Sequence, residues 1–328
     1  MTNTPLSPRP LSHLAEARRR VMSAAQLRAH GVSAAEVDAQ CRPGGPWQRL
    51  LPGVYLLHPG PPTSEERLRA ALLYAERRPG DGQVMITGLA ALALHRFTAA
   101  PPLPSLNRID VLVPGTRRLR STGAVRVVRA QELPVAQEVT TLPVAPVARA
   151  LADAIGPLGD AHAVRRLLSE AVRAGHCEPA AVVRELHRGR LLTRPHVMDA
   201  VDALLAEGRA LAEDRLYRMV RSHGLPEPLW NVDLRLPGGP FLGGVDAYWP
   251  DHAVAVELDA RAPHQDDEVT RTECARKREH LDRIGITLVH LAPRKLREAP
   301  DQQAVVVRTA LMAAGDRSPA AYVVVLPR

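Results

Sequence analysis

The sequence predicts a protein of mixed α+β and α/β class that folds as more than one domain. Its 328 residues exceed the usual size of a single domain. Apolar residues at helical spacing alternate along the chain with short runs of strand type, separated by turns rich in Pro and Gly. Hydrophobic residues make up 45% of the chain, an ordinary proportion for a globular fold.

Charge is unevenly distributed along the chain. The net charge is +8, with 9 basic and 5 acidic residues over 1–70, 17 and 11 over 71–200, and 17 and 19 over 201–328. Any electrostatic attraction to nucleic acid is therefore expected in the first 200 residues. The alternative is compositional, because Arg, Ala and Pro dominate while Lys277 and Lys295 are the only lysines, as a GC-rich coding sequence would produce.

Several classes of protein are not indicated. No apolar run approaches the roughly 20 residues of a membrane span, so no membrane partner is expected. Residues 1–13 are rich in Pro, Ser and Thr with no apolar segment after them, which predicts a disordered tail rather than a signal peptide. The expected location is therefore the cytoplasm. Cys41, Cys177 and Cys274 are odd in number and far apart, so neither a disulfide framework nor a zinc site is predicted.

Residues 14–60 are predicted to form helices followed by a hairpin. Ser23 and Ser33 are suited to cap helices, and Gly31 ends the first of the two. The predicted helices span 14–22, 24–30 and 34–41, and the hairpin strands span 47–51 and 53–57 around Pro52-Gly53. Helix, three-residue turn, helix and hairpin is the layout of a winged helix-turn-helix module.

Such a module implies double-stranded DNA as a partner, since its second helix enters the major groove and its hairpin touches phosphates. The candidates for DNA contact are Arg18, Arg19, Arg20, Gln40, Arg42, Gln48 and Arg49. However, Glu36 and Asp38 on the second helix would be repelled by phosphates. Modules of this kind also bind proteins, so a protein partner stays open.

Residues 63–204 are predicted to form a mixed α/β region and a helical connector. Thr63 and Glu66 have the spacing of a capping box, which starts a helix that runs to about Arg78. Further helices are expected at 87–97, 142–155, 160–175, 178–188 and 195–206, and strands at 108–114 and 125–129. His95 is expected to be a core or interface residue rather than a metal ligand. The arginines between 117 and 129 form either a phosphate-binding patch or a solvated hairpin surface.

The first half of the chain resembles the abortive-infection type IV antitoxin family. The N-terminal match is carried by Ala-Gln-Leu-Arg-Ala-His-Gly-Val-Ser and Trp-Gln-Arg-Leu-Leu-Pro-Gly-Val-Tyr. The match to the middle of that family is carried by Thr-Gly-Leu-Ala-Ala-Leu-Ala-Leu-His and Ile-Asp-Val-Leu-Val-Pro. The resemblance implies an antitoxin-like transcriptional regulator, with a toxin or another protein as its partner.

The C-terminal region contains two short strands with carboxylates, at 245–249 and 253–259, around the turn Pro250-Asp251-His252. Period two places Glu257 and Asp259 on the face opposite Val254, Val256 and Leu258. If Asp251 and His252 form the loop, Asp246 lies across from Glu257, with β-carbons about 4.5–5.5 Å apart. Three carboxylates on one face repel each other unless something positive lies among them. Mg²⁺ or Mn²⁺ held by Asp246 and Glu257 is the expected cofactor.

Residues 205–295 resemble the PD-(D/E)XK nuclease superfamily. A predicted helix at 208–223 carries Glu213, followed by a strand with Asp246 and a strand with Glu257. The run Val-Glu-Leu-Asp-Ala-Arg-Ala-Pro-His is similar to the very-short-patch-repair-endonuclease-like branch. The resemblance implies a restriction-endonuclease-like α/β domain over 205–328. The catalytic positions it implies are Glu213, Asp246, Glu257, Asp259, His264 and Lys277.

The sequence departs from the superfamily at two positions. The lysine of the Glu-x-Lys motif is replaced by Asp259, and the glycine of the branch by Ala260. Lys277 lies on a helix predicted at 268–284, from which it could reach the site and replace the missing motif lysine. A strand at 286–291, a helix at 304–314 and a strand at 321–326 complete the predicted domain.

Three hypotheses follow from the sequence. The first is a metal-dependent DNA endonuclease. The second is a DNA-binding, antitoxin-like regulator whose nuclease-like domain is inactive. The third is a protein that only binds other proteins. The missing lysine favours the second hypothesis over the first, and the retained carboxylates favour the first, so enzymatic activity is open.

Overall fold

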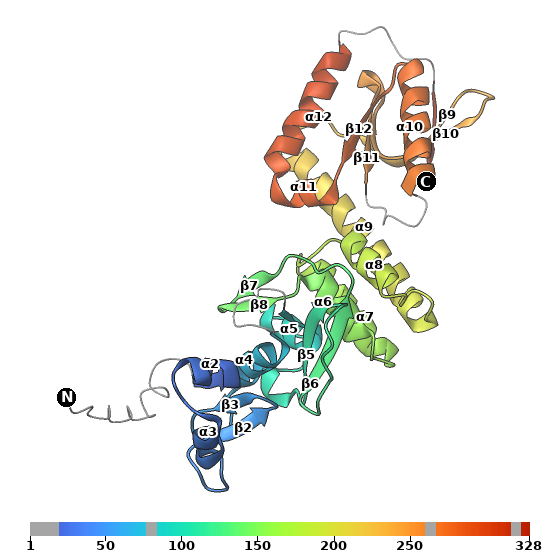
Figure 1. The fold of residues 1–328 in the computed structure, drawn as a ribbon. Coiled ribbons are helices and arrows are strands. Elements are labelled where there is room, and N and C mark those ends of the chain that lie inside the picture. Colours follow the sequence, from blue (N-terminus) through green and yellow to red (C-terminus); the bar gives the residue numbers. More distant parts are fainter. Residues whose placement is uncertain (1–19, 77–83, 260–266, 316–322) are drawn as a thin grey trace. The chain divides into compact units, whose positions relative to one another are not determined.

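A computed structural model describes residues 20–76, 84–259, 267–315 and 323–328 (Figure 1). Within these ranges the protein has three β-sheets and eleven α-helices, which confirms a mixed α and β protein. The chain divides into two compact units, Met1–Glu170 and Ala171–Arg328. Among the described helices, none combines the length and apolar character that crossing a membrane requires. The predicted tail at 1–13, Arg18, Arg19 and His264 lie outside the described residues.

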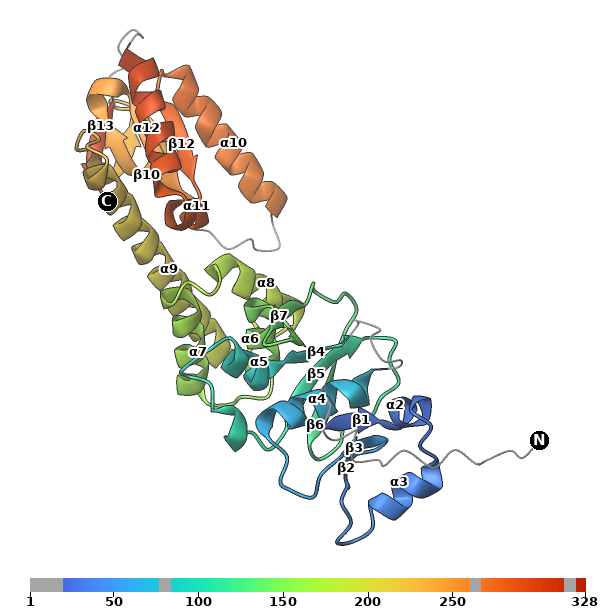
Figure 2. The ribbon, with the colours of Figure 1, turned by 90° about the vertical axis from the view of Figure 1, so that its left-hand side faces the viewer.

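The first unit begins with two helices and a three-stranded antiparallel sheet of order β1-β3-β2 (Figure 2). The elements are β1 Val21–Ser23, α2 Ala24–Ala29, α3 Ala34–Gln40, β2 Gln48–Leu51 and β3 Val54–Leu56. Ser23 and Ser33 each form the capping box of the helix that follows. The expected order of helix, turn, helix and hairpin is confirmed. The prediction that the first helix runs to Met22 is wrong, because Val21 and Met22 pair with β3.

The first unit continues with a five-stranded sheet of order β6-β5-β4-β8-β7. Its elements are α4 Ser64–Ala75, β4 Met85–Thr87, α5 Gly88–Leu94, β5 Ile109–Pro114, β6 Val125–Ala130, β7 Gln137–Val139, β8 Leu142–Val144 and α6 Val147–Ile155, with a 3₁₀ turn at Leu103–Ser105. The prediction of a helix at 142–155 is wrong at its start, because Leu142–Val144 form β8 and the helix α6 begins at Val147. Pro143 and Pro146 explain the difference, because proline is excluded from a helix interior.

Three further helices follow: α7 Ala161–Arg173, α8 Pro179–Arg188 and α9 Pro195–Ser222. The sequence predicted two helices, at 195–206 and 208–223, where the structure has α9 alone. Gly208 lies inside α9, and a β-carbon added there would meet Pro179 Cγ at 2.5 Å. Gly208 therefore lets α8 and α9 approach closely and does not end a helix. The domain boundary expected at residue 205 falls inside α9, and the second compact unit begins earlier, at Ala171.

The second unit is built on a five-stranded sheet of order β12-β11-β10-β9-β13. Its strands are β9 Leu229–Arg235, β10 Phe241–Trp249, β11 Val254–Leu258, β12 Thr287–Leu291 and β13 Val324–Pro327. Its remaining helices are α10 Asp267–Arg283, α11 Pro293–Glu298 and α12 Pro300–Gly315. Strands β11 and β12 are parallel and the other pairs antiparallel. Strand β9 and helix α11 were not expected from the sequence.

Helices cover both faces of this second sheet. Leu281 of α10 packs among buried residues of β9 to β12 on one face. On the other face, Leu216, Leu296 and Val307 bring α9, α11 and α12 over β10 and β11. Figure 1 shows α10 and α12 on opposite sides of the strands. Val254, Val256 and Leu258 all face the α9, α11 and α12 side, as their period-two spacing predicts.

Candidate functional site

The register of β10 and β11 decides which carboxylates meet. Ala247 pairs with Val256 and Trp249 with Val254, around a 3₁₀ turn at Pro250–His252. Continuing this register by one step sets Asp246 opposite Glu257, as the sequence predicts. The loop has one more residue than expected, and Ala253 closes it with a φ of 46°. The two carboxylates therefore lie on neighbouring strands, where Asp246 contacts Arg209 of α9 and Glu257 contacts Lys277 of α10.

Asp246 is almost completely buried, with 3% of its surface exposed. Its Oδ2 accepts a hydrogen bond from the backbone N–H of Leu258 at 2.6 Å, and its Oδ1 accepts one from Arg209 Nη2 at 2.6 Å. Burial raises the pKa of the Asp246 carboxyl, and this outweighs the Leu258 hydrogen bond and the Arg209 charge, which act in the opposite direction. The carboxylate is held in a fixed orientation because both of its oxygens are bonded.

Arg209 joins Glu213 to this carboxylate. Its Nε donates to Glu213 Oε1 at 2.8 Å, and the two residues are four apart on α9. The guanidinium thus bridges the carboxylates of Glu213 and Asp246. The sequence reasoning missed Arg209. The signal that would have found it is an arginine one helical turn before the expected Glu213.

Glu257 is paired with Lys277, the residue expected to replace the missing motif lysine. Lys277 Nζ lies 2.7 Å from Glu257 Oε2 and donates a second hydrogen bond to the Gly244 carbonyl at 2.7 Å. Gly243 makes room for this lysine, since a β-carbon there would lie 2.6 Å from Lys277 Cε. Its φ of 131° is also a backbone conformation that residues other than glycine rarely adopt, so a substitution at Gly243 would be strained. The register of β10 on β9 shifts at this same point.

Asp259 does not join the cluster within the described part of the chain. It is exposed, and its backbone N–H donates to the Leu291 carbonyl at 3.0 Å. The described contacts join four of the six expected catalytic residues in two groups: Arg209 links Glu213 to Asp246, and Lys277 pairs with Glu257.

The positive charge expected among the carboxylates is supplied by Arg209 and Lys277 themselves. The described residues contain no group of three or more His, Cys, Asp or Glu that could hold a metal ion. The pair Asp246 and Glu257 nevertheless fits Mg²⁺ or Mn²⁺ by ligand type, because Mg²⁺ commonly binds one or two carboxylates together with water and substrate phosphate. Such an ion would compete with Arg209 for Asp246 Oδ1 and with Lys277 for Glu257 Oε2.

The residues expected to contact DNA differ in their surroundings. Arg20 and Arg42 are exposed, and Gln40 is partly buried. Arg49 is exposed but forms an ion pair with Asp38 at 3.1 Å and lies over the Tyr55 ring. Gln48 on β2 is held within the protein. Its side-chain Nε2 donates hydrogen bonds to the backbone carbonyls of His58 at 3.0 Å and Gly60 at 2.7 Å.

Residues of the middle region hold the fold together. His95 is partly buried, and its Nε2 lies 2.9 Å from the Ala145 carbonyl. Arg126 is bound by Asp110 through two hydrogen bonds of 2.9 and 2.5 Å. Arg117 and Arg129 donate to backbone carbonyls. Three of the five arginines are thus bonded within the protein, whereas Arg118 and Arg120 are exposed, so neither a phosphate-binding patch nor a solvated hairpin surface describes the whole set.

No protein-family model and no curated protein matches the chain. The family resemblances noted in the sequence therefore rest on their motifs.

Proposed function

We propose that the protein binds DNA and that its second unit is a Mg²⁺- or Mn²⁺-dependent DNA endonuclease with a restriction-endonuclease-like fold. One observation carries this proposal. Glu257 on β11 lies beside Lys277, whose amine is 2.7 Å away, and Asp246 lies on the neighbouring strand β10, close enough for its carboxylate to interact with the charge of Glu257. Two acidic residues and a lysine are the set that the PD-(D/E)XK resemblance implies for phosphodiester hydrolysis, in which a metal ion activates water and stabilises charge on the phosphate.

Each residue has a part in the proposed reaction. A metal ion bound by Asp246 and Glu257 would supply an activated water and neutralise charge on the phosphate. The Leu258 N–H fixes the orientation of Asp246. Lys277 places a positive charge beside Glu257, where its 17% exposed side chain is shielded from solvent and therefore acts more strongly on a developing negative charge. Glu213 positions Arg209 at the edge of the same cluster.

DNA binding is proposed for the N-terminal helices and hairpin, acting as a winged helix-turn-helix. Arg20 and Arg42 are exposed there, and the first 200 residues carry the excess of basic side chains. Phosphate contacts by such arginines fix the orientation of a protein on DNA without reading its sequence.

A second candidate function is an antitoxin-like DNA-binding regulator that does not cleave and has a toxin or other protein partner. The observation that favours it is the ion pair of Arg209 with Asp246, at 2.6 Å. This contact occupies one of the oxygens that a metal ion would need, so the cluster holds together without a metal.

Plasmid cleavage with Mg²⁺ and with Mn²⁺ separates the two functions. The endonuclease predicts nicking or cutting that chelation stops and that Asp246→Ala, Glu257→Ala and Lys277→Ala each abolish. Lys295→Ala is the matched control, because it removes the only other lysine, which is exposed on α11. Absence of cutting by a protein that still shifts DNA in a gel would contradict the endonuclease and support the regulator. Cutting that survives Asp246→Ala and Glu257→Ala would place any activity elsewhere.

A further inference from the structure

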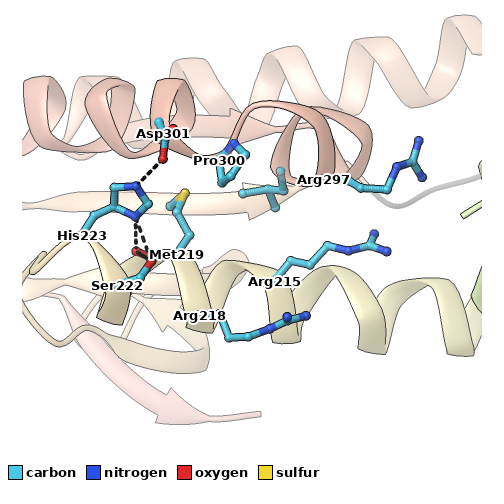
Figure 3. A pocket seen from close by; sticks show the side chains of 9 residues that line it. Arg215, Arg218, Met219, Ser222, His223, Arg297, Pro300 and Asp301 are labelled. Atoms are coloured by element: carbon cyan, nitrogen blue, oxygen red, sulfur yellow. Dashed lines mark hydrogen bonds and ion pairs between the residues drawn. The ribbon is translucent and has the colours of Figure 1, made fainter.

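The second unit has a pocket that shares no residue with the Asp246–Glu257 cluster. It has a volume of about 630 Å³, within the range of small-molecule sites. It lies between α9, α11 and the start of α12 (Figure 3). The lining residues are Arg215, Arg218, Met219, Ser222, His223, Leu296, Arg297, Pro300 and Asp301.

The two ends of this pocket differ in chemistry. Figure 3 shows Arg215, Arg218 and Arg297 toward one end and the His223–Asp301 contact at the other. His223 Nε2 lies 2.9 Å from Asp301 Oδ1, so the histidine end already contains its own acidic partner. An anionic ligand is therefore favoured at the arginine end.

The three arginines differ in how far they are neutralised. Arg218 pairs with Asp214 at 2.6 Å, and Arg297 pairs with Glu178 at 2.6 Å. Arg215 is partly buried, and no carboxylate pairs with it in the part of the chain that the structure describes. A partly buried guanidinium without an acidic partner is costly, and an anion in the pocket would compensate it.

We propose that this pocket binds a phosphate monoester, with the phosphate held by Arg215 together with Arg218 and Arg297. Guanidinium groups bind phosphate through charge-assisted, often bidentate hydrogen bonds. A monoester carries a charge of about −1.5 to −2 at neutral pH, more than the single negative charge of a backbone diester. The buried side chains of Met219 and Leu296 give the remainder of the ligand an apolar surface. Neither metal binding nor DNA cleavage is needed for this site.

Calorimetric titration of the full-length protein tests the site. The probes are inorganic phosphate, deoxyadenosine 5′-monophosphate, deoxyadenosine without phosphate, and a short DNA strand with either a 5′-phosphate or a 5′-hydroxyl. Inorganic phosphate and the mononucleotide or the 5′-phosphorylated strand should bind, deoxyadenosine should not, and the 5′-hydroxyl strand, which the N-terminal module can also hold, should bind more weakly than the 5′-phosphorylated strand. Binding of the mononucleotide identifies a free ligand as the source of the phosphate. Binding of the 5′-phosphorylated strand alone identifies a DNA end.

Arg215→Gln should weaken binding of the phosphate-bearing probe roughly tenfold to a hundredfold, as expected for loss of hydrogen bonds to a charged group. Arg221→Gln is the matched control, because it removes the same charge from the same helix at an exposed position where the arginine contacts Tyr217. Equal weakening by both substitutions, no weakening by Arg215→Gln, or no binding of any phosphate-bearing probe would overturn the proposal.

Discussion

Lys277 on α10 donates a hydrogen bond to Glu257 on β11 over 2.7 Å, and the two side chains are only 17% and 12% exposed. The same amine reaches the Gly244 carbonyl on β10. One side chain therefore ties a helix to two neighbouring strands at the position of the carboxylate cluster. Removing the lysine leaves Glu257 as a shielded charge that has lost this partner.

We expect Lys277→Ala to lower the free energy of unfolding by roughly 1–3 kcal/mol, less than for a fully buried pair because both groups keep some solvent contact. Lys295→Ala should leave it within about 0.5 kcal/mol, as for other surface substitutions. Urea unfolding of the three proteins measures the difference. Equal stabilities for the two variants would show that the Glu257 contact contributes nothing.

A metal ion of the kind we propose would have to compete with Arg209 for Asp246. Because its Nη2 is bonded to Asp246 Oδ1, Arg209→Ala should increase the affinity of the second unit for Mn²⁺, while Asp246→Ala should remove binding. Titration calorimetry with Mn²⁺ measures both effects. Arg218→Ala is the control, since it breaks the comparable surface pair with Asp214 on the same helix. An unchanged Mn²⁺ affinity in Arg209→Ala would argue against a metal at Asp246.

Asp246 should make stability depend on pH in an identifiable direction. Burial raises its folded pKa above the ordinary value of 3.8, so at neutral pH the folded protein holds a carboxylate whose charged form is disfavoured. This cost is relieved as pH falls through the raised folded pKa. Asp246→Asn cannot titrate and lacks this effect.

The stability of the wild type relative to Asp246→Asn should therefore rise as pH falls from 7 toward 4. Urea unfolding at a series of pH values measures this difference, and the contributions of carboxylates that do not interact with Asp246 cancel between the two proteins. A difference that stays constant or falls over that range would show that the pKa of Asp246 is not raised.

His223 should stabilise the fold when it is protonated. Its Nδ1 lies 2.9 Å from the Met219 carbonyl and its Nε2 2.9 Å from the Asp301 carboxylate, so both ring nitrogens meet acceptors. The hydrogen bond to Asp301, followed by that to Met219, raises the pKa of His223 above 6.5, while the nearby Arg308 acts in the opposite direction. The stabilisation is complete below the unfolded pKa and is lost as pH rises through the folded pKa.

Asp301→Asn should lower the pKa of His223, as measured by NMR titration of the imidazole. The stability advantage of wild type over this variant should shrink as pH rises above that folded pKa. An imidazole pKa that does not change in Asp301→Asn would mean that the Asp301 contact is not formed in solution.

A residue proposed to contact DNA can be distinguished from a structural one in the N-terminal region. Arg42→Ala removes an exposed charge and should weaken DNA binding, with the slope of log affinity against log salt falling by about 0.9. Gln48→Ala removes hydrogen bonds to the His58 and Gly60 carbonyls and should instead lower stability by about 1–2 kcal/mol. Gel shifts and thermal unfolding measure the two effects. The reverse pattern would place Gln48 rather than Arg42 at the DNA surface.

Local signals in the sequence predicted most of the elements. Ser23, Ser33 and Thr63 start their helices through capping boxes, a pattern confined to four consecutive residues. The pairing of Asp246 with Glu257 was likewise predictable, because a short turn fixes the register of a hairpin. Prediction failed where a local signal was overridden. Gly208 reads as a helix end, yet it serves a close approach to Pro179 inside α9.

The sequence by itself determined the helix caps, the β10–β11 register and the presence of carboxylates on one strand face, because each depends on residues close together in the chain. Only the tertiary structure decided that Arg209 bridges Glu213 and Asp246 and that Lys277 reaches Glu257 across the space opened by Gly243. Only it brought Arg215 and Arg297 to one pocket. Apart from Arg209 and Glu213, which are four apart on one helix, these residues are separated by 20 to 82 positions, and how helices pack on the sheet decides which of them meet.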